Sequence, residues 1–516
     1  MKKLILSTLL ASFVCIAMLK AEVKLPNVFA DDMVLQCSMP IRFWGLGDKN
    51  TSVEVELGKN KVSAIVSKDG KWSLELPAMV ASNKPKDIKV YENGKLVKTI
   101  KNVLVGEVWV LAGQSNMAWR LEGSDDSTIA KARAKYPNMR YFKINTSANS
   151  PKEEFNAEGG KWVVASPETV GDFSAVGFYF AEKIHRDLNV PVGMIMTAMG
   201  GTKMISWWPP SHISKLKYAE DYVKKFKEDT DDYVKNNRYE KKLADHLEYR
   251  KDYDARCAIA KKTGKPAPTP NWDKHSRPLK WTPYPARNLP SYHWNAKVAP
   301  FAKFSVRGVL WYQGESDSGG IERNFFAEIY KCMVNAWRDK WENPKLYFLS
   351  TQLPSYLHDW SVVRDGQLKG ANELKYSGIA NIIDTGTKDD VHPCGKTIVG
   401  HRLAWVAERD IYKLNKAPTY APLATKSAFS KGMAIVEFNT FGNALSGRGE
   451  PRGFELKIKG KWVEAKAELR CKDKVFVVSP DANAIPEGVR YLWKGWAKPD
   501  VWLYNLDGIP AFPFSL

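Results

Sequence analysis

The sequence has few cysteines and few histidines for its length. Six cysteines and eight histidines are spread through 516 residues. Cys15 lies in an N-terminal leader, and the other five are odd in number and widely spaced, unlike a disulfide framework or a zinc site. One isolated disulfide stays open. No Cys, His and Asp spacing indicates a catalytic metal, and no glycine-rich loop precedes the lysine of a phosphate-binding loop. The sequence therefore predicts no cofactor.

Long apolar runs are missing after the first twenty residues. Lys2 and Lys3 precede the apolar run Leu4–Leu19, and Ala21 offers a small residue for cleavage. This pattern predicts a secretory signal peptide over residues 1–21. No later segment has the roughly 20 apolar residues that a membrane helix requires. We expect a secreted or periplasmic protein without a membrane span.

Acidic residues are outnumbered by basic ones. The chain has 77 Lys and Arg against 57 Asp and Glu, a formal net charge of +20. A basic balance is typical of proteins that bind nucleic acid, anionic glycans or an acidic surface. Export argues against nucleic acid as the partner, and one lysine-rich helical stretch holds much of the charge. The basic balance therefore favours an anionic sugar only weakly.

Both ends of the mature chain show the alternation of β-strands. A length of 516 residues predicts about three domains. In residues 22–103, Val53, Val55 and Leu57 alternate with polar residues, and Asn93-Gly94 between apolar pairs predicts a hairpin. Alternation returns in residues 416–516. We expect a β-sandwich-like domain at each end.

Residues 104–415 have a different pattern, in which apolar runs alternate with amphipathic helical stretches. This predicts an α/β domain whose largely parallel sheet has helices on both faces. The expected strands are Val108–Leu111, Met139–Ile144, Val192–Thr197, Val306–Tyr312, Leu346–Ser350 and Ile379–Ile383. The expected helices are Ser174–Leu188, Ile321–Trp341 and Lys396–Tyr412.

An insertion of about residues 212–290 interrupts this domain. Its first part, to about residue 262, is strongly helical and rich in Lys and Glu, and its second part is rich in Pro and Trp. Trp272, Trp281 and His275 are candidates to line a sugar site. Ordinary packing of an irregular loop is the alternative interpretation.

A serine follows the first expected strand of the α/β domain. Val108–Leu111 ends at Gly113-Gln114-Ser115, and ligands bind at the carboxyl ends of strands in open α/β sheets. A serine on a sharp turn between strand and helix is typical of a nucleophile. The alternative is that Ser115 caps the following helix.

Three further polar clusters follow expected strands. Gly200-Gly201 after the third strand allows backbone N–H groups to approach an oxyanion. Gln313, which begins the Gln-Gly-Glu turn after the fourth strand, is a suitable oxyanion donor, and Glu315 could orient its neighbours. Asp389 precedes His392 with the Asp-x-x-His spacing that sets a carboxylate against an imidazole. Each cluster alone also fits an ordinary turn or loop, but together they predict a serine hydrolase.

Four motifs at these positions resemble the sialate O-acetylesterase family, a branch of the SGNH hydrolases. They are GQSNM at 113–117, GGT at 200–202, WYQGESD at 311–317 and DDVHP at 389–393. The resemblance extends to VLQ at 34–36 near the N-terminus and to LYNLDGIPAFPF at 503–514 near the C-terminus. The chain departs from the family pattern over about residues 212–280 and around residues 291–295, which leaves the substrate open.

The resemblance implies an SGNH-type flavodoxin-like α/β/α central domain flanked by the two β modules. It implies Ser115 as nucleophile and His392 as general base and acid, with the N–H groups of Ser115 and Gly201 and the side chain of Gln313 as oxyanion donors. Gln114 and Glu315 are expected to line the same substrate-binding region.

The acidic partner of His392 is less defined. Asp389 is expected from its spacing, while Asp390, or no carboxylate, stays open. The expected activity is removal of O-acetyl groups from glycans, foremost O-acetylated sialic acids. An acetylxylan esterase, a non-catalytic glycan-binding protein and a glycosidase that uses Glu315 are the alternatives.

Overall fold

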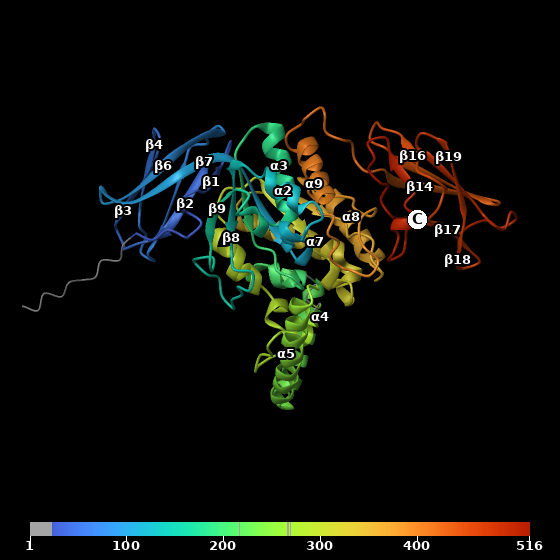
Figure 1. Ribbon diagram of the computed structural model, residues 1–516, viewed down its shortest axis with the longest axis horizontal. Helices are drawn as coiled ribbons and strands as arrows, with labels where there is room; N and C mark the ends of the chain where they lie inside the picture. The colour runs from blue at the N-terminus through green and yellow to red at the C-terminus, as the bar shows by residue number, and fades with distance from the viewer. Residues whose placement is uncertain (1–22, 216, 266–267, 269) are drawn as a thin grey trace, which may run out of the picture.

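The computed structural model describes residues 23–215, 217–265, 268 and 270–516 (Figure 1). The expected signal peptide lies outside these residues. A β-rich N-terminal part and a β-rich C-terminal part flank a mixed central part, and a pair of long helices projects from the central part (Figure 1). Among the described residues, no helix is long and apolar enough to cross a bilayer, and all five cysteines are free.

One long strand, β7 (Lys95–Gly113), connects the N-terminal and central parts. Its first half pairs with β6 (Ser82–Glu92) across the predicted Asn93-Gly94 turn, where φ is 48° and 80°. Positive φ at both positions fits the type I′ hairpin that this dipeptide favours. Its second half pairs with central strands on both sides. The boundary expected between residues 103 and 104 therefore falls inside a continuous strand.

The strands of the N-terminal part are antiparallel except β1, which pairs in parallel with β7. β3 pairs with β4 and β6, and β2 pairs with β5. Val53, Val55 and Leu57 of β3 are fully buried, as their alternation predicts. The remaining bounds are β1 Val34–Gln36, β2 Ile41–Leu46, β3 Ser52–Leu57, β4 Asn60–Ile65 and β5 Lys71–Leu76.

The central sheet has the order β13-β12-β11-β7-β10-β8-β9. All neighbours are parallel except β8 and β9. The six expected strands are present, and the antiparallel edge strand β9 was not predicted. The bounds are β8 Tyr136–Lys143, β9 Lys161–Ala165, β10 Val192–Met196, β11 Gly308–Tyr312, β12 Tyr347–Thr351 and β13 Ser377–Ala380.

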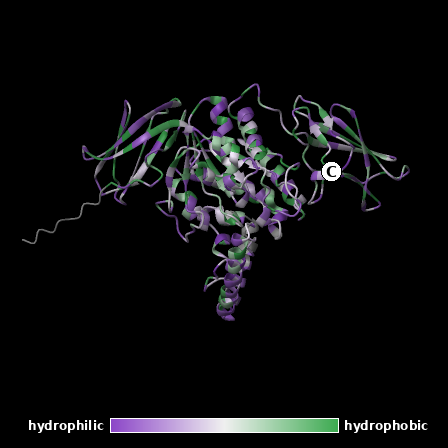
Figure 2. Ribbon diagram, in the orientation of Figure 1, coloured by the Kyte–Doolittle hydropathy of each residue, from purple (hydrophilic) through white to green (hydrophobic). Residues whose placement is uncertain are grey.

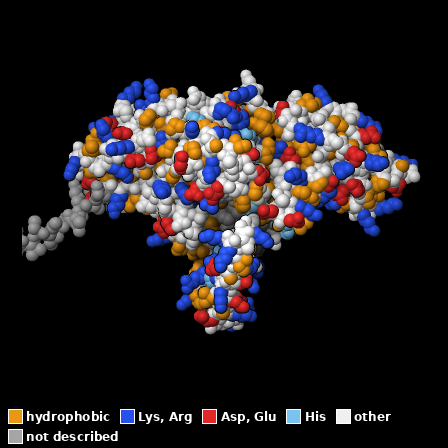
Figure 3. Space-filling model, in the orientation of Figure 1, with side chains coloured by type: hydrophobic (Ala, Val, Ile, Leu, Met, Phe, Trp, Pro, Cys, Tyr) orange, Lys and Arg blue, Asp and Glu red, His pale blue; other side chains and the backbone are white. Residues whose placement is uncertain are grey.

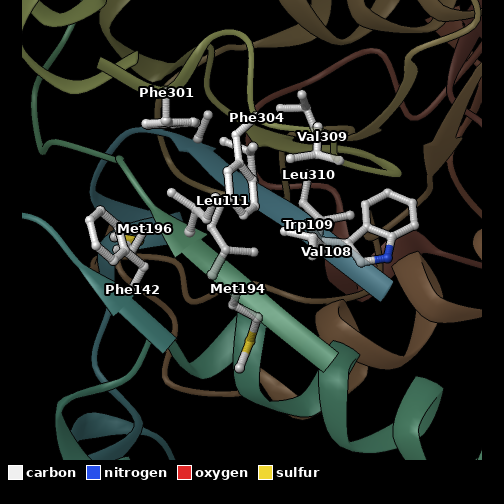
Figure 4. Close-up of a cluster of buried hydrophobic side chains, with 14 of the residues drawn as sticks. Val108, Trp109, Leu111, Phe142, Met194, Met196, Phe301, Phe304, Val309 and Leu310 are labelled. Carbon is white, nitrogen blue, oxygen red and sulfur yellow. The ribbon is translucent and has the colours of Figure 1, made fainter. Parts of the chain in front are cut away.

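The apolar run at the end of β7 lies in the middle of this sheet (Figure 4). Val108–Leu111 is fully buried, because side chains on both faces of the strand are covered. Trp109 meets Phe180 on one face, with ring centroids 5.0 Å apart. On the opposite face, Trp311 of β11 meets Trp337 at 6.3 Å. The sheet is thus the middle layer of three.

Helices form the two outer layers. α3 (Ala175–Leu188) packs with α9 (Thr397–Asp410) on the Trp109 face, and α7 (Phe326–Lys340) packs with α8 (Ser361–Asn372) on the other. Three of these helices were expected. α8 was missed because its sequence has few apolar residues. Two glycines, Gly366 and Gly370, instead bring its backbone close to α7.

The insertion contains the projecting helices α4 (Lys217–Lys235) and α5 (Tyr239–Lys262). Many of their residues are hydrophilic (Figure 2). Lys and Arg side chains are scattered over the visible face of the molecule rather than gathered in one patch (Figure 3). The predicted helical first part of the insertion is confirmed. The short helices of the central part are α1 Ser115–Ala118, α2 Ser127–Arg133 and α6 Trp272–His275.

The C-terminal part has its own apolar core in small antiparallel sheets. The aromatic tail packs back on the molecule, with Phe512 and Phe514 buried. The strands are β14 Leu423–Ser430, β15 Met433–Asn439, β16 Leu445–Gly447, β17 Phe454–Ile458, β18 Lys461–Glu464, β19 Lys466–Cys471, β20 Lys474–Val478, β21 Gly488–Tyr491, β22 Leu503–Asn505 and β23 Phe514–Ser515.

Candidate active site

Ser115 stands at the carboxyl end of β7, directly after a turn that requires glycine. Gly113 has φ of +122°, and a Cβ there would lie 2.1 Å from the Tyr312 carbonyl oxygen. Only glycine tolerates both conditions. The Gln114 N–H then donates to the same carbonyl at 2.9 Å, and Ser115 begins α1 with its side chain partly exposed. The close pairing of β7 with β11 thus fixes where the serine emerges.

His392 meets Ser115 from a loop that follows β13 and precedes α9. Its Nε2 lies 2.8 Å from Ser115 Oγ, across 277 residues of sequence. The Trp119 ring stacks on the imidazole, with centroids 5.3 Å apart and planes at 19°. The structure therefore brings together a hydroxyl and an imidazole in the geometry that proton transfer between them needs.

No carboxylate is hydrogen-bonded to the His392 ring within the described chain. Asp390 is nearest, with Oδ1 3.9 Å from Nδ1, and it accepts the His392 backbone N–H at 2.8 Å. Asp389 is exposed, and no partner is found for its side chain among the described residues. The arrangement thus brings Asp390 to the ring, whereas the sequence spacing favoured Asp389.

The paired glycines pass beside the nucleophile, as expected. A Cβ on Gly200 would lie 3.4 Å from Ser115 Cβ. Gly201 has φ of +69°, and its carbonyl accepts the Nε–H of the buried Arg287 at 3.3 Å. No acceptor for the Gly201 N–H is found in the part of the chain that the structure describes. That N–H is available to a ligand at Ser115.

Gln313 is fully buried after β11, and its amide is engaged by protein groups. Nε2 donates to the Thr202 carbonyl at 3.1 Å and also to the Asp317 carboxylate. Use of this amide as an oxyanion donor would require one of these bonds to break. Gln114 is also buried, and its side-chain oxygen accepts the Ser316 N–H at 3.3 Å. In this structure both glutamines connect loops of the site.

A second set of side chains lies directly behind Ser115 and His392. Asn116 donates from Nδ2 to Glu315 Oε1 at 2.7 Å and to the Val391 carbonyl at 3.0 Å. Its Oδ1 accepts from the Lys396 ammonium at 2.5 Å. Asn116 and Lys396 are buried, and Glu315 Oε2 is buried with no partner found within the described chain. Glu315 is a candidate from the sequence alone, whereas Asn116 and Lys396 are not.

Burial shifts the pKa values of the ionisable side chains in this region in the direction that favours their neutral forms. Burial raises the pKa of Glu315 to about 7 and that of Asp317 to about 6. It lowers the pKa of Lys396 to about 8, against the opposing effect of Glu315. Burial also lowers the pKa of His392, and the Lys396 charge lowers it further while Asp390 raises it. The imidazole is therefore neutral, and able to accept a proton, at neutral pH.

The sequence contained only weak signals for Asn116, Trp119, Arg287 and Lys396. The first two lie inside or beside the GQSNM motif, and Lys396 follows His392 by four residues, but none has a spacing that specifies a contact. Arg287 reaches Gly201 from the end of the insertion. These contacts arise because loops from four strands converge at one edge of the sheet.

The aromatic candidates in the insertion contact other insertion residues. Trp281 is 45% exposed and lies edge-on to Phe226, while His275 lies against Tyr253 and is hydrogen-bonded to Arg250. The side chain of Trp272 is outside the described residues. Packing within the insertion accounts for the placed residues without a sugar.

Comparisons with known proteins identify the family of this chain. A family model for a sialic acid-specific acetylesterase, a carbohydrate esterase, matches residues 105–237 and 279–407, just over half of the chain. The human sialate O-acetylesterase is 21% identical over 94% of this chain and 90% of its own length, and the rat sialate O-acetylesterase is 22% identical over 92% and 90%.

A solved carbohydrate acetylesterase from Xanthomonas citri has a TM-score of 0.77 and 27% identity, over 96% of this chain and 99% of the other. All four motifs that carry the site fall within the matched ranges. The chain belongs to the sialic acid-specific acetylesterase family of carbohydrate esterases and is a carboxylic ester hydrolase.

Proposed function

We propose that this esterase is a secreted serine enzyme that removes O-acetyl groups from glycans, with Ser115 as nucleophile. The 2.8 Å contact between Ser115 Oγ and His392 Nε2 carries the proposal. Ser115 attacks the acetyl carbonyl while His392 takes its proton and then returns it to the departing sugar hydroxyl. Water, deprotonated by His392, releases acetate from the acetyl-enzyme.

Two backbone N–H groups are placed to stabilise the oxyanion. Ser115 is the first residue of α1, where helix geometry leaves the N–H without an intrahelical partner. The Gly201 N–H lies on the loop that passes beside Ser115. Gln313 supports this loop through the Thr202 carbonyl. We propose these two N–H groups as the primary donors, because neither requires an existing bond to break.

The proposed SGNH-type, flavodoxin-like fold is supported by strand order. Without the β8 and β9 edge, the sheet reads β10-β7-β11-β12-β13. Numbered along the chain, this is the order 2-1-3-4-5 of flavodoxin-like sheets. Ser115 follows the strand at which the chain changes direction across the sheet. The proposed domains are 22–103, 104–415 and 416–516, with β7 common to the first two. The proposal of secretion is supported by the leader at residues 1–21.

O-acetylated sialic acid is the proposed substrate, and the insertion supports an acidic sugar. A cavity of about 240 Å³ is lined by Lys242, Lys274 and Arg277 together with Asp245 and Ser276. In the described chain none of these three cations pairs with a carboxylate. Ser276 contacts Arg287, which contacts Gly201 beside the nucleophile. A carboxylate on the substrate would therefore meet unpaired positive charge near the site.

The first experiment is acetate release from a panel of acetylated glycans. The panel contains O-acetylated sialic acid and acetylated xylan fragments, with Ser115→Ala and His392→Ala as controls. We expect release from the acidic sugar and a loss of several orders of magnitude in both variants. Faster release of acetate from the xylan fragments would make acetylated xylan the substrate in place of O-acetylated sialic acid. Unchanged release by Ser115→Ala would refute the serine mechanism, and tight binding without release would identify a glycan-binding protein.

A further inference from the structure

The imidazole of His392 is held in place without a hydrogen-bonded carboxylate on Nδ1. Its nearest acidic neighbour, Asp390, is 57% exposed in its side chain, and the Oδ1–Nδ1 distance is 3.9 Å. An exposed charge at that distance interacts weakly with its neighbours, because water screens it. The ring position must therefore depend on other contacts of the loop.

Asn116 connects that loop to the nucleophile and to the loop after β11. One amide group bonds to the Val391 carbonyl, to Glu315 and to Lys396, which lie on three sides of it. Val391 and Lys396 bracket His392, and Asn116 is the residue after Ser115. Because Asn116 has no exposed surface, loss of its side chain would leave buried polar groups without partners.

Lys396 places a positive charge behind the imidazole, with no carboxylate close enough to neutralise it as an ion pair in the described chain. Its Nζ bonds to Asn116 Oδ1 and lies 5.9 Å from the Trp119 ring centroid and 5.7 Å from that of Tyr312. These aromatic faces stabilise a desolvated cation. Glu315 reaches it only through Asn116. The Trp119 ring that faces Lys396 also stacks on His392.

We propose that Asn116, Glu315 and Lys396 form a buried positioning network that sets the His392 loop against Ser115 and, through the lysine charge, favours the neutral imidazole. The inference rests on the proposed roles of Ser115 and His392. The network performs one task of a buried acidic partner, placement of the ring, and reverses the other, stabilisation of the imidazolium. Asn116 supplies the geometry, while Lys396 opposes protonation of His392 before substrate binds.

The groups around the imidazole determine the expected pH effect. Lys396 before α9 and Asp390 on the same loop act on the ring itself, while Cys394, Glu315 after β11 and Asp125 before α2 act on Lys396. Of these, Lys396 lowers the pKa of His392 and Asp390 raises it. Removal of the lysine charge therefore raises the pKa of His392, and the acid limb of the pH–rate profile moves to higher pH.

The test is the pH dependence of kcat and KM for acetate release by Lys396→Met and Asn116→Ala. For Lys396→Met we expect a lower kcat and an acid limb at higher pH. For Asn116→Ala we expect kcat to fall by about 10²-fold from misplacement of the loop. KM should stay within about twofold in both, since neither residue is exposed to substrate. Lys396→Gln, which keeps a donor for Asn116 without the charge, should show the same shift of the acid limb.

Lys297→Met is the matched control. Lys297 is equally buried, at 1% exposure, and bonds to the Asn145 and Thr146 carbonyls away from Ser115. We expect no shift of the acid limb in this variant. An unshifted limb in both Lys396→Met and Lys396→Gln would overturn the electrostatic part, and full kcat in Asn116→Ala would overturn the positioning part. If Ser115→Ala retained activity, the proposed function itself would fail instead.

Discussion

At the scale of single residues, the acidic neighbour of His392 differs from that of a buried Ser-His-Asp triad. In such triads the buried aspartate bonds to Nδ1, and its loss costs about 10⁴ in kcat. Here Asp390 is exposed and makes its closest bond to the His392 backbone. A fall of that size is therefore not expected on removing either acidic residue of this loop.

We predict that Asp390→Asn lowers kcat/KM by at most about fivefold, because an exposed pair contributes about 1 kcal/mol or less. Since Asp390 raises the pKa of His392, its neutralisation should move the acid limb to lower pH. Asp389→Asn is the matched control and should leave both quantities unchanged. Steady-state kinetics from pH 4 to 9 measures this, and a larger loss in Asp389→Asn would reassign the partner.

The unmodified enzyme should also stay active in moderately acidic solution. The reference pKa of histidine is about 6.5, and burial followed by the Lys396 charge lowers that of His392. His392, the general base, therefore remains largely unprotonated at pH values somewhat below 6.5. We expect the kcat/KM profile for acetate release to have its acid midpoint below that value. A midpoint at or above 6.5 would contradict the environment described for His392.

At the scale of elements, the site depends on how closely β7 approaches β11. In Gly113→Ala, the alanine would have an unfavourable φ of +122°, and its Cβ would lie 2.1 Å from the Tyr312 carbonyl oxygen. We predict that it lowers the free energy of unfolding by more than the 1–2 kcal/mol of a left-handed alanine and that it removes activity. Gly94→Ala has φ of +80° and no atom within 4 Å. It should cost about 1–2 kcal/mol and keep full activity, as measured by denaturant unfolding and acetate release.

The cations of the insertion should affect KM for acidic substrates only. Lys274→Ala and Arg277→Ala each remove a cation from the cavity near Arg287. We predict that each raises KM for an O-acetylated sialic acid by up to about fivefold, as expected for an exposed charge contact, and leaves hydrolysis of p-nitrophenyl acetate unchanged. Lys251→Ala, exposed elsewhere on α5, is the control. An equal rise with acetylated xylan would contradict carboxylate recognition.

At the scale of the whole molecule, the three parts are joined by different means. The N-terminal and central parts share β7. The C-terminal part is connected through Arg364, a fully buried residue of α8 that donates to Leu353 and Pro354 in the central part and to Lys494 and Gly495 in the C-terminal part. The shared strand should make the first two parts unfold together, whereas the third is joined by side-chain bonds, by a backbone bond from Tyr356 to Gly495 and by a small apolar cluster.

We predict that Arg364→Met makes the C-terminal part unfold in a separate transition, before the rest of the molecule unfolds. Four carbonyls lose this donor, three of them in buried bonds, at roughly 1–3 kcal/mol for each buried carbonyl left without a partner. Calorimetry should show an added transition at lower temperature. Arg338→Met removes similar bonds to Leu346, Lys375 and Tyr376 within the central part. It should lower Tm without the extra transition, and one shared transition in both variants would refute the idea.

The local sequence pattern determined many of the structural elements of this protein and the location of its site. The continuous apolar run before Gly113 predicts a doubly covered strand, Asn93-Gly94 predicts its hairpin, and the four polar clusters predict a site at the strand ends. These features depend on neighbours in sequence, since strand burial, turn geometry and helix periodicity are set within a few residues. The structure confirms the elements and brings Ser115 and His392 into contact.

Tertiary structure decided what depends on pairing between distant segments. The continuation of β7 into the central sheet, the approach of α8 through two glycines, and the position of Asp390 at the imidazole follow from packing. The same holds for Asn116 and Lys396, whose side chains meet across 280 residues. No local period encodes such contacts, because burial of each polar group is favourable only once its partner from another strand end is in place.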